Sequence, residues 1–261
     1  MDGTLVTQEK VLTDAAIAGA RSLRQAGVLF ALTSGRPPRG MEMLLEPLDI
    51  DSPIAAFNGG LMVDRDLETL EEHALPEDLV EPVVEHMQSF DLDVWLYRGA
   101  DWYVPDPKGP HVDREAWTVK FDPKVMKDGV KGLTEGVIKL VGVNDDHDAI
   151  EKATLAAVKK FGDKVTAAAS QPYYLDVTHP RANKGEVARY LARRYKLVPE
   201  EIATIGDEPN DILMFDHSGL SIAMGNADPE AKEAAHEVTR SSEEDGFAYA
   251  VEQFVLPAAR S

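Results

Sequence analysis

Residues 28–37 read Val-Leu-Phe-Ala-Leu-Thr-Ser-Gly-Arg-Pro, an unbroken apolar run that stops at a polar turn. Strands that are buried on both faces of a parallel sheet have this continuously apolar character. The preceding residues, 13–25, have the period of an amphipathic helix, with Thr13 as its N-cap and Gly27 as its stop signal. The segment therefore predicts a helix followed by a buried strand, which is the repeating unit of an α/β fold.

The same alternation of helix and strand recurs on both sides of the chain's middle third. The further elements predicted by this pattern are a helix near 38–47, a strand at 53–57, a helix at 185–195, a strand at 202–205, a helix after Asp211 and a strand at 220–223. Units of this kind build a doubly wound parallel, Rossmann-like sheet, whose ligand lies beyond the carboxyl ends of the strands. The expected fold class is therefore α/β.

The middle of the chain has a different pattern, in which strands follow one another directly. The predicted elements are a helix at 77–90, strands at 92–97, 101–104 and 136–143, a helix at 146–161, and strands at 164–169 and 172–177. Strands that are adjacent in sequence favour an antiparallel sheet. We therefore expect residues 1–76 and 178–261 to form the core domain, with residues 77–177 inserted as a second, α+β domain.

The composition restricts the possible ligands. The chain has 261 residues, of which 44% are hydrophobic, and a net charge of −19, because 46 acidic residues outnumber 27 basic ones. This balance argues against a nucleic-acid partner, since phosphate backbones are bound by clustered Lys and Arg side chains. An anionic substrate would need a local positive charge, such as a divalent cation, a buried lysine or a helix N-terminus.

No stretch of the sequence has the run of about 20 apolar residues that a membrane-spanning helix needs, so we expect no membrane association. The chain also contains no cysteine. Disulfides and cysteine-ligated zinc are therefore excluded, and a reducing compartment, the cytoplasm, is the expected location.

Polar clusters that could carry chemistry lie directly after predicted strands or at a helix start. They are Asp2-Gly3-Thr4-Leu5, Ser34-Gly35-Arg36, Lys184, and Gly206-Asp207-Glu208-Pro209-Asn210-Asp211. Asp207 and Asp211 are four residues apart, at a strand end and a helix start, where their carboxylates can converge on Mg²⁺, which prefers oxygen ligands. The alternative is that the two aspartates are ordinary loop and N-cap residues.

Lys184 and Ser34 each allow two interpretations. An ammonium group at a helix N-terminus can bind phosphate, and so can a serine hydroxyl at the end of a strand. Taken singly, however, a lysine is usually a solvated surface charge and a serine in this position is usually a turn residue.

Taken together, the clusters resemble the motifs of the haloacid dehalogenase superfamily, in its Cof-type or type IIB branch. The matching segments, in order, are Met1-Asp2-Gly3-Thr4-Leu5, Leu32-Thr33-Ser34-Gly35-Arg36-Pro37, Asn183-Lys184-Gly185, and the run from Gly206 through Asn210-Asp211 to Met214, followed by Ala223-Met224-Gly225-Asn226-Ala227. Asn58-Gly59-Gly60 and Asp245-Gly246 also match this branch. The resemblance covers the whole chain and implies a core with an inserted cap domain of the C2B type.

The resemblance implies a Mg²⁺-dependent phosphatase that hydrolyses phosphate monoesters of small metabolites, such as sugar phosphates, through an aspartyl-phosphate. Asp2 would be the general acid and base, and its backbone carbonyl would help to hold the metal. The other implied roles are metal ligation by Asp207 and Asp211, and phosphate binding by Ser34, Gly35, Lys184, Asn58 and Asn210, with Ser34 and Lys184 also stabilising the aspartyl-phosphate.

The sequence contains only the second part of the family's first motif. In the family the nucleophilic aspartate lies two residues before the acid/base aspartate, which here falls immediately ahead of Met1, and a central strand leads into it. Loss of a central strand would remove more free energy than a typical domain has, at roughly 2–5 kcal/mol per large buried side chain. We therefore expect that the natural chain starts upstream. The competing expectation is a chain that begins at Met1, with another segment filling the gap.

Other interpretations remain open from the sequence alone. A protein that lost the nucleophile would be an inactive phospholigand or metal-binding protein of the same fold, and a receiver domain would share the acidic sheet edge but would not need the long insertion. Aromatic residues of the inserted domain, Trp95, Tyr97, Trp102 and Tyr103, could contact a substrate but are more typical of a core. The phosphorylated metabolite is not specified, and the chain could be a monomer or a homodimer.

Overall fold

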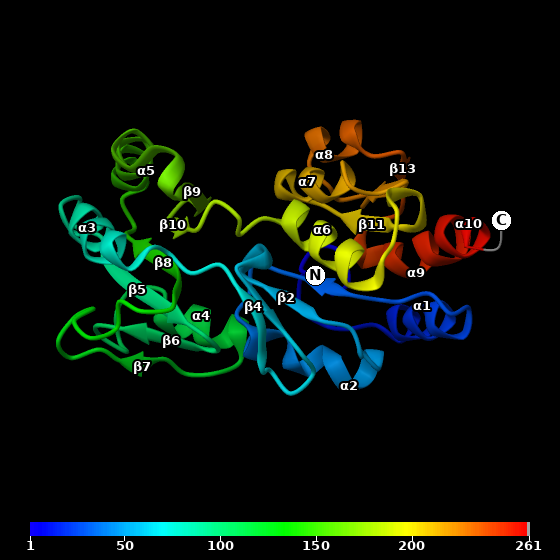
Figure 1. Cartoon of the computed structure of the whole chain (residues 1–261), viewed down its shortest axis with the longest axis horizontal. Coiled ribbons are helices and arrows are strands. Elements are labelled where there is room, and N and C mark those ends of the chain that lie inside the picture. The colour runs from blue at the N-terminus through cyan, green and yellow to red at the C-terminus, as the bar shows by residue number, and fades with distance from the viewer. Residues whose placement is uncertain (260–261) are drawn as a thin grey trace. The chain divides into compact units, whose positions relative to one another are not determined.

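The computed structural model describes residues 1–259, which form two compact units. Unit 1 comprises Met1–Ser34, Glu42–Asn58 and Asn183 onward, and unit 2 comprises Gly35–Met41 and Gly59–Ala182. The elements of both units are labelled in Figure 1. Unit 2 is thus largely an insertion between the chain segments of unit 1, and all of the predicted inserted domain, residues 77–177, lies within it. The domain boundaries drawn from the sequence stay a prediction.

Unit 1 alternates helices with parallel strands. Its elements are α1 (Asp14–Gln25), β1 (Leu32–Thr33), α2 (Leu45–Leu48), β2 (Ile54–Ala56), α6 (Lys184–Tyr195), β11 (Ala203–Gly206), α7 (Ile212–Phe215), β12 (Leu220–Ala223), α8 (Pro229–Ala234), β13 (Glu237–Val238), α9 (Gly246–Ala250), the π-helical turn η7 (Val251–Val255) and α10 (Leu256–Ala258). β1 pairs in parallel with β2, and β11, β12 and β13 form a second parallel set.

Both units also contain short 3₁₀ turns. They are η1 (Pro38–Leu44), η2 (Phe57–Gly59), η3 (Gly162–Lys164), η4 (Pro199–Glu201), η5 (Pro209–Asp211) and η6 (Ser242–Glu244).

The predicted start of the first helix is confirmed. The Thr13 side chain accepts a hydrogen bond from the Ala16 amide at 3.1 Å, which satisfies one of the free N–H groups of the first turn of α1. Ala16, Ala20 and Leu23 are buried on one face of the helix. The helical period in the sequence therefore identified the packed face of α1 correctly.

The strand predicted at 28–32 is much shorter in the structure. Only Leu32 and Thr33 are paired, with Ile54 and Ala55 of β2, while Leu29 is 46% exposed. An apolar run reports burial only where neighbouring strands cover it, and residues 28–31 join no strand ladder in the described part of the chain. The prediction of a fully buried strand here is therefore wrong.

Unit 2 contains a six-stranded sheet in the order β7-β6-β5-β8-β10-β9. Its elements are β3 (Leu61–Val63), β4 (Thr69–Glu72), α3 (Glu77–Gln88), β5 (Asp93–Arg98), β6 (Asp101–Val104), α4 (Val112–Val119), β7 (Lys124–Val125), β8 (Val137–Val143), α5 (His147–Phe161), β9 (Thr166–Gln171) and β10 (Tyr174–Thr178). All neighbouring strands of this sheet are antiparallel except β6 and β7, which are parallel. The predicted antiparallel sheet is confirmed. The β3–β4 hairpin and α4 carry no clear sequence signal and were not predicted.

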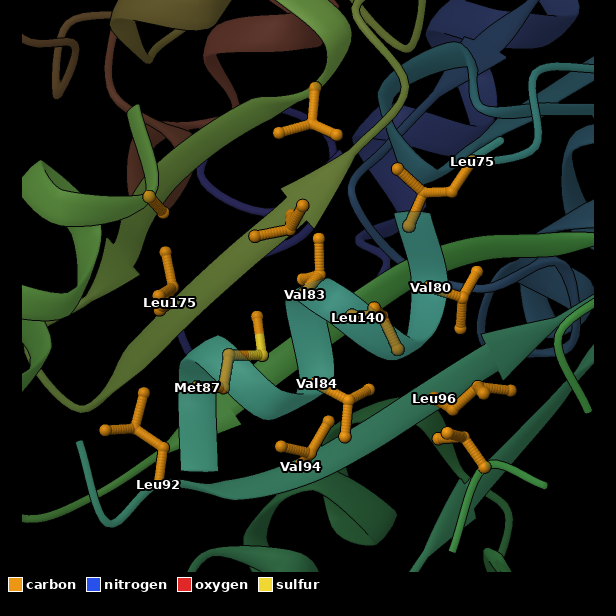
Figure 2. Close-up of a cluster of buried hydrophobic side chains, with 14 of the residues drawn as sticks. Leu75, Val80, Val83, Val84, Met87, Leu92, Val94, Leu96, Leu140 and Leu175 are labelled. Atoms are coloured by element: carbon orange, nitrogen blue, oxygen red, sulfur yellow. The ribbon is translucent and has the colours of Figure 1, made fainter. Parts of the chain in front are cut away.

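Helices α3 and α5 cover one face of this sheet (Figure 1). Val83 and Met87 of α3 are fully buried and pack with Leu96, Leu140 and Leu175 from three strands. Figure 2 shows these side chains between the helix and the strands. Side chains repeat their direction every 3.6 residues along a helix and every 2 residues along a strand. The apolar residues of α3 and of the strands therefore lie in one shared layer.

Three of the four aromatic residues considered as possible substrate contacts are buried in the inserted domain, and the fourth, Tyr103, is partly buried. Trp95, Tyr97 and Trp102 are each 2% exposed or less, and the rings of Tyr97 and Trp102 stack with centroids 5.9 Å apart. Tyr103 packs against the core beneath the helices. The interpretation of these residues as core, rather than as substrate contacts, is therefore the one that the structure supports.

The helices described in residues 1–259 include none with the length and apolar character that crossing a membrane requires.

Candidate active site

The acidic pair predicted from the sequence lies at the carboxyl end of β11, in unit 1. Asp207 directly follows this strand and Asp211 follows the 3₁₀ turn η5, and the two side chains are buried, with 8% and 2% exposed. The Asp211 Oδ2 atom accepts hydrogen bonds from the backbone N–H groups of Asp207 at 2.9 Å and Glu208 at 3.0 Å. Asp211 makes no side-chain cap to α7, so its carboxylate holds the loop that carries Asp207.

Lys184 meets this pair from the start of α6. Its side chain is buried, and Nζ donates a hydrogen bond to Asp211 Oδ1 at 2.5 Å. Asn183 caps the helix by accepting from the Glu186 amide at 3.0 Å, so the ammonium group sits at a helix N-terminus. Of the two interpretations of Lys184, the structure rules out the solvated surface charge.

Residues 2–4 lie against Asp207. The Thr4 hydroxyl donates to Asp207 Oδ1 at 2.6 Å, and Asn226 Nδ2 donates to the Gly3 carbonyl at 2.8 Å. Gly3 has φ of +69°, and a Cβ atom there would lie 2.0 Å from Asp207 Oδ2. Only glycine fits this close approach, which explains why a glycine follows Asp2.

Burial and neighbouring charges shift the pKa values of the carboxyl groups in the acidic loop. Burial raises the pKa of Asp207, and burial together with the neighbouring Asp207 and Asp211 charges raises the pKa of Glu208. For Asp211, burial acts in the same direction, but the Lys184 ammonium and its hydrogen bond hold the pKa below its usual value. The charge of the Met1 amino group lowers the pKa of both aspartates as well, so Lys184 and this amino group are the positive charges beside the acidic pair.

Asp2 has an ion-pair partner that the sequence did not indicate. Lys10 Nζ lies 2.8 Å from Asp2 Oδ1, and the two side chains are 23% and 34% exposed. Lys10 adopts φ of +61°, which directs the chain back after a turn. No spacing rule links a lysine eight residues away in a loop to an aspartate, so only the structure reveals this pair.

Ser34 and Asn58, two of the predicted phosphate-binding residues, contact each other at the ends of β1 and β2. Ser34 is buried, its N–H donates to the Ala55 carbonyl at 3.0 Å, and its carbonyl accepts from the Asn58 N–H at 2.7 Å. Asn58 adopts the left-handed conformation with φ of +56°. Among residues 1–259, the Asn58 side-chain oxygen is buried without a hydrogen-bond partner, so it is available to a ligand.

Gly35 and Asn210 are less closely placed. Gly35 is exposed and begins the short segment grouped with unit 2. Asn210 is also exposed, and no described hydrogen bond or ion pair joins its side chain to Asp207, Asp211 or Lys184. The structure thus brings together Asp207, Asp211 and Lys184 directly, and Ser34 with Asn58.

Residues missed at the sequence level are mainly those that support the acidic pair. They are Thr4, Lys10, Glu208 and Asn226. Thr4, Glu208 and Asn226 are part of the motifs quoted above, and this position in the sequence could have identified them as candidates. Their partners become visible only when chain segments distant in sequence are folded together.

A sequence profile of the haloacid dehalogenase-like hydrolases matches residues 1–251. Among curated proteins, the 5-amino-6-(5-phospho-D-ribitylamino)uracil phosphatase YwtE of Bacillus subtilis is 26% identical over 278 residues, covering 98% of this chain and 96% of the relative. A solved haloacid dehalogenase-like hydrolase from Bacteroides thetaiotaomicron has a TM-score of 0.89 and 27% identity, covering 97% of this chain and 96% of that structure. The structure of a sugar phosphatase of subclass IIB matches with a TM-score of 0.84 at 21% identity, covering 98% and 97% of the two chains, a likeness of fold.

The chain therefore belongs to the haloacid dehalogenase-like hydrolase family. The resemblance to the Cof-type, subclass IIB branch and the expected α/β core with a cap are confirmed, as is the prediction of a phosphatase of this family.

Proposed function

We propose that the protein is a Mg²⁺-dependent phosphate-monoester hydrolase that acts on small phosphorylated metabolites, such as sugar phosphates. The observation that carries this proposal is the buried Lys184–Asp211 pair beside Asp207, where two carboxyl groups and an ammonium group adjoin at the carboxyl end of a parallel strand. Relatives with phosphatase names that cover 97% and 98% of this chain support it.

The donor set fits Mg²⁺. Asp207 and Asp211 offer carboxylate oxygens, and a divalent cation bound beside them would stabilise the ionised forms that burial disfavours at Asp207 and Glu208. Among residues 1–259, no three side chains of His, Cys, Asp or Glu are grouped closely enough to hold an ion by themselves. We assign the site to Asp207, Asp211 and Asp2, the last through its backbone carbonyl, with remaining positions open to other oxygen ligands. The bound ion would neutralise charge on the phosphoryl group.

The protein's own side chains divide the remaining tasks. Lys184 binds phosphate oxygens from a helix N-terminus, and the Ser34 hydroxyl and Asn58 add hydrogen bonds. We assign backbone and side-chain contacts to phosphate also to Gly35 and Asn210. Asp2 gives a proton to the leaving alkoxide and then takes one from water, while Lys10 balances its charge and orients it.

The chemical step proposed is a two-stage phosphoryl transfer. An aspartate two residues before Asp2 attacks phosphorus, the ester oxygen leaves with the proton from Asp2, and water then hydrolyses the aspartyl-phosphate. That nucleophile would precede residue 1 of the sequence given. The inserted domain would act as a lid that selects the leaving group.

The test is phosphate release from sugar phosphates and an aryl phosphate, with and without Mg²⁺, by the 261-residue chain and by a form extended upstream in the natural reading frame. We expect Mg²⁺-dependent release by the extended form. Asp207→Asn should abolish it, whereas the matched Asp216→Asn, at an exposed aspartate after α7, should not. Folded proteins that bind Mg²⁺ or phosphate but release no phosphate in either form would replace the proposal with the binding-protein alternative.

A further inference from the structure

The two edges of the sheet in unit 2 are built differently. The edge strand β7 has two residues, and its Lys124 carries a charge that pairs with Asp101 at 2.5 Å. The opposite edge, β9, has six residues with the sequence Thr-Ala-Ala-Ala-Ser-Gln, without charge or proline, and all but one are exposed. Proteins normally protect sheet edges with charges, proline or very short strands, because a bare edge pairs with another chain.

Helix α5 extends this bare edge into a surface. It packs over β9 and β10 through Ile150, Ala153, Ala157 and Phe161. Its neighbour α3 lies on the Ala153 side, where His86 Nε2 is 2.9 Å from the Ala153 carbonyl. At 100° per residue, the outer side of α5 that points away from α3 carries Glu151, Leu155 and Val158. Leu155 is 65% exposed and Val158 is 52% exposed, so an apolar strip adjoins the free strand edge.

We propose that this surface binds a second copy of the chain. β9 would pair antiparallel with β9 of the second copy, which continues the sheet across a two-fold axis perpendicular to it. The middle of the strand, at Ala168 or Ala169, then faces its own equivalent in the other copy, and the two α5 helices lie side by side and antiparallel on the same face. Leu155 meets its own equivalent near the axis.

The charges on α5 favour a second copy over a different partner. The first half of the helix carries Asp148, Glu151 and Lys152, whereas the second half carries Lys159 and Lys160 and no acidic residue. Antiparallel packing about the helix midpoint brings Glu151 of each copy opposite Lys159 of the other, so the surface is complementary to itself. Two chains of net charge −19 repel each other in general. Contact is therefore best tolerated where the strand is uncharged and where the acidic half of one helix lies beside the basic half of the other.

The first test is sedimentation velocity of the chain at increasing concentrations. We expect a concentration-dependent dimer. Leu155→Glu, which places two like charges at the axis, should raise the dissociation constant by about tenfold or more. The matched control is Leu213→Glu, at a leucine of α7 that is 46% exposed, and it should leave the dimer unchanged. Circular dichroism melts of both variants verify that they fold.

A charge exchange then tests the arrangement itself. Glu151→Lys alone and Lys159→Glu alone should each raise the dissociation constant between a few-fold and about tenfold, because two symmetric ion pairs become repulsive, and the double variant should restore dimerisation. A chain that is monomeric at all concentrations would overturn the proposal. So would a dimer that Leu155→Glu and Leu213→Glu affect equally, or a double variant that remains as weak as the single ones.

Discussion

The two units of this molecule use their buried volume in opposite ways. In unit 2 the interior between α3, α5 and the sheet is apolar, and Val83, Met87 and Leu140 are fully enclosed. In unit 1 a comparable depth of burial at the end of β11 is given to Lys184, Asp207 and Asp211. Apolar burial stabilises a fold directly, whereas buried charges are retained only when they are paired and usually because they serve a function. The contrast supports the proposal that unit 1 carries the chemistry, because its buried charges have no counterpart in the apolar core of unit 2.

The three tryptophans of the chain offer a way to separate the units experimentally. Trp95, Trp102 and Trp117 all lie in unit 2, so their fluorescence reports its unfolding, whereas far-ultraviolet circular dichroism reports helices of both units. A variant that acts on one unit can therefore be recognised by comparing the two signals.

The largest expected effect comes from breaking the buried pair in unit 1. Lys184→Met leaves the Asp211 carboxylate buried without its cation, and should lower the free energy of unfolding by about 3–5 kcal/mol near neutral pH. The pKa of Asp211 is lowered in the folded state, so its contribution to stability is present above its unfolded pKa and is lost as the pH falls through the folded value. The difference between Lys184→Met and the parent should therefore shrink in acid.

Denaturant unfolding at several pH values, followed by circular dichroism and by tryptophan fluorescence, measures this effect. Lys196→Met, at an exposed lysine after the same helix, is the matched control. Equal stability of the Lys184 and Lys196 variants would show that the pair is not the determinant of stability proposed here.

The next effect concerns the apolar core of unit 2. Leu140→Ala removes a fully buried side chain between α3 and the sheet, and should lower the free energy of unfolding by about 2–5 kcal/mol (Figure 2). Leu155→Ala, at a leucine that is 65% exposed, should change it by less than about 0.5 kcal/mol. Tryptophan fluorescence should report the loss for Leu140→Ala. A fluorescence transition that is unchanged in this variant would contradict the assignment of the core.

Sequence patterns located the regular helices and strands of both units. In unit 1, α6 was predicted at 185–195 and β12 at 220–223, and they span Lys184–Tyr195 and Leu220–Ala223. In unit 2 the short β3, β4, α4 and β7 were missed. α3, α5, β5, β6, β8 and β10 follow regular periods and were found within a few residues. The length of the strand predicted at 28–32 was overestimated, because an apolar run forms a strand only where neighbouring strands pair with it, and the sequence pattern does not show which strands are neighbours. In the site, Asp207, Asp211 and Lys184 were identified as candidates because motif order placed them at element ends. The Asp2–Lys10 pair and the Thr4 contact depend on tertiary folding and were not predicted.

The third prediction concerns Asp207, where a substitution should raise the stability of the folded state and not lower it. Burial raises the pKa of Asp207, so the ionised side chain destabilises the folded state at neutral pH, and the penalty is relieved as the pH falls through the raised folded value. Asp207→Asn retains an oxygen that can accept from Thr4 and should raise the thermal midpoint near neutral pH while removing Mg²⁺ binding. Each gain of 1 kcal/mol corresponds to about 2–4 °C for a chain of this size.

Differential scanning calorimetry with and without Mg²⁺ measures both effects. Saturating Mg²⁺ should raise the midpoint of the parent and leave that of Asp207→Asn unchanged, because only a folded state with an intact site binds the ion. Asp216→Asn serves as the control, and a Mg²⁺ response that persists in Asp207→Asn would remove Asp207 from the ligand set.

The smallest expected effects come from removing one helix N-cap side chain in each unit. Thr13 caps α1 in unit 1, and Asp146 caps α5 in unit 2 by accepting from the amides of Asp148 and Ala149. Replacing either residue by Ala should lower the free energy of unfolding by about 1 kcal/mol, because one side-chain acceptor for free N–H groups is lost. Thr13 also donates to Asp245 Oδ1 at 2.8 Å, so Thr13→Ala should have the slightly larger effect. If the units unfold separately, Asp146→Ala shifts the tryptophan signal and Thr13→Ala does not; equal shifts of both signals in both variants would show that the two units unfold as one.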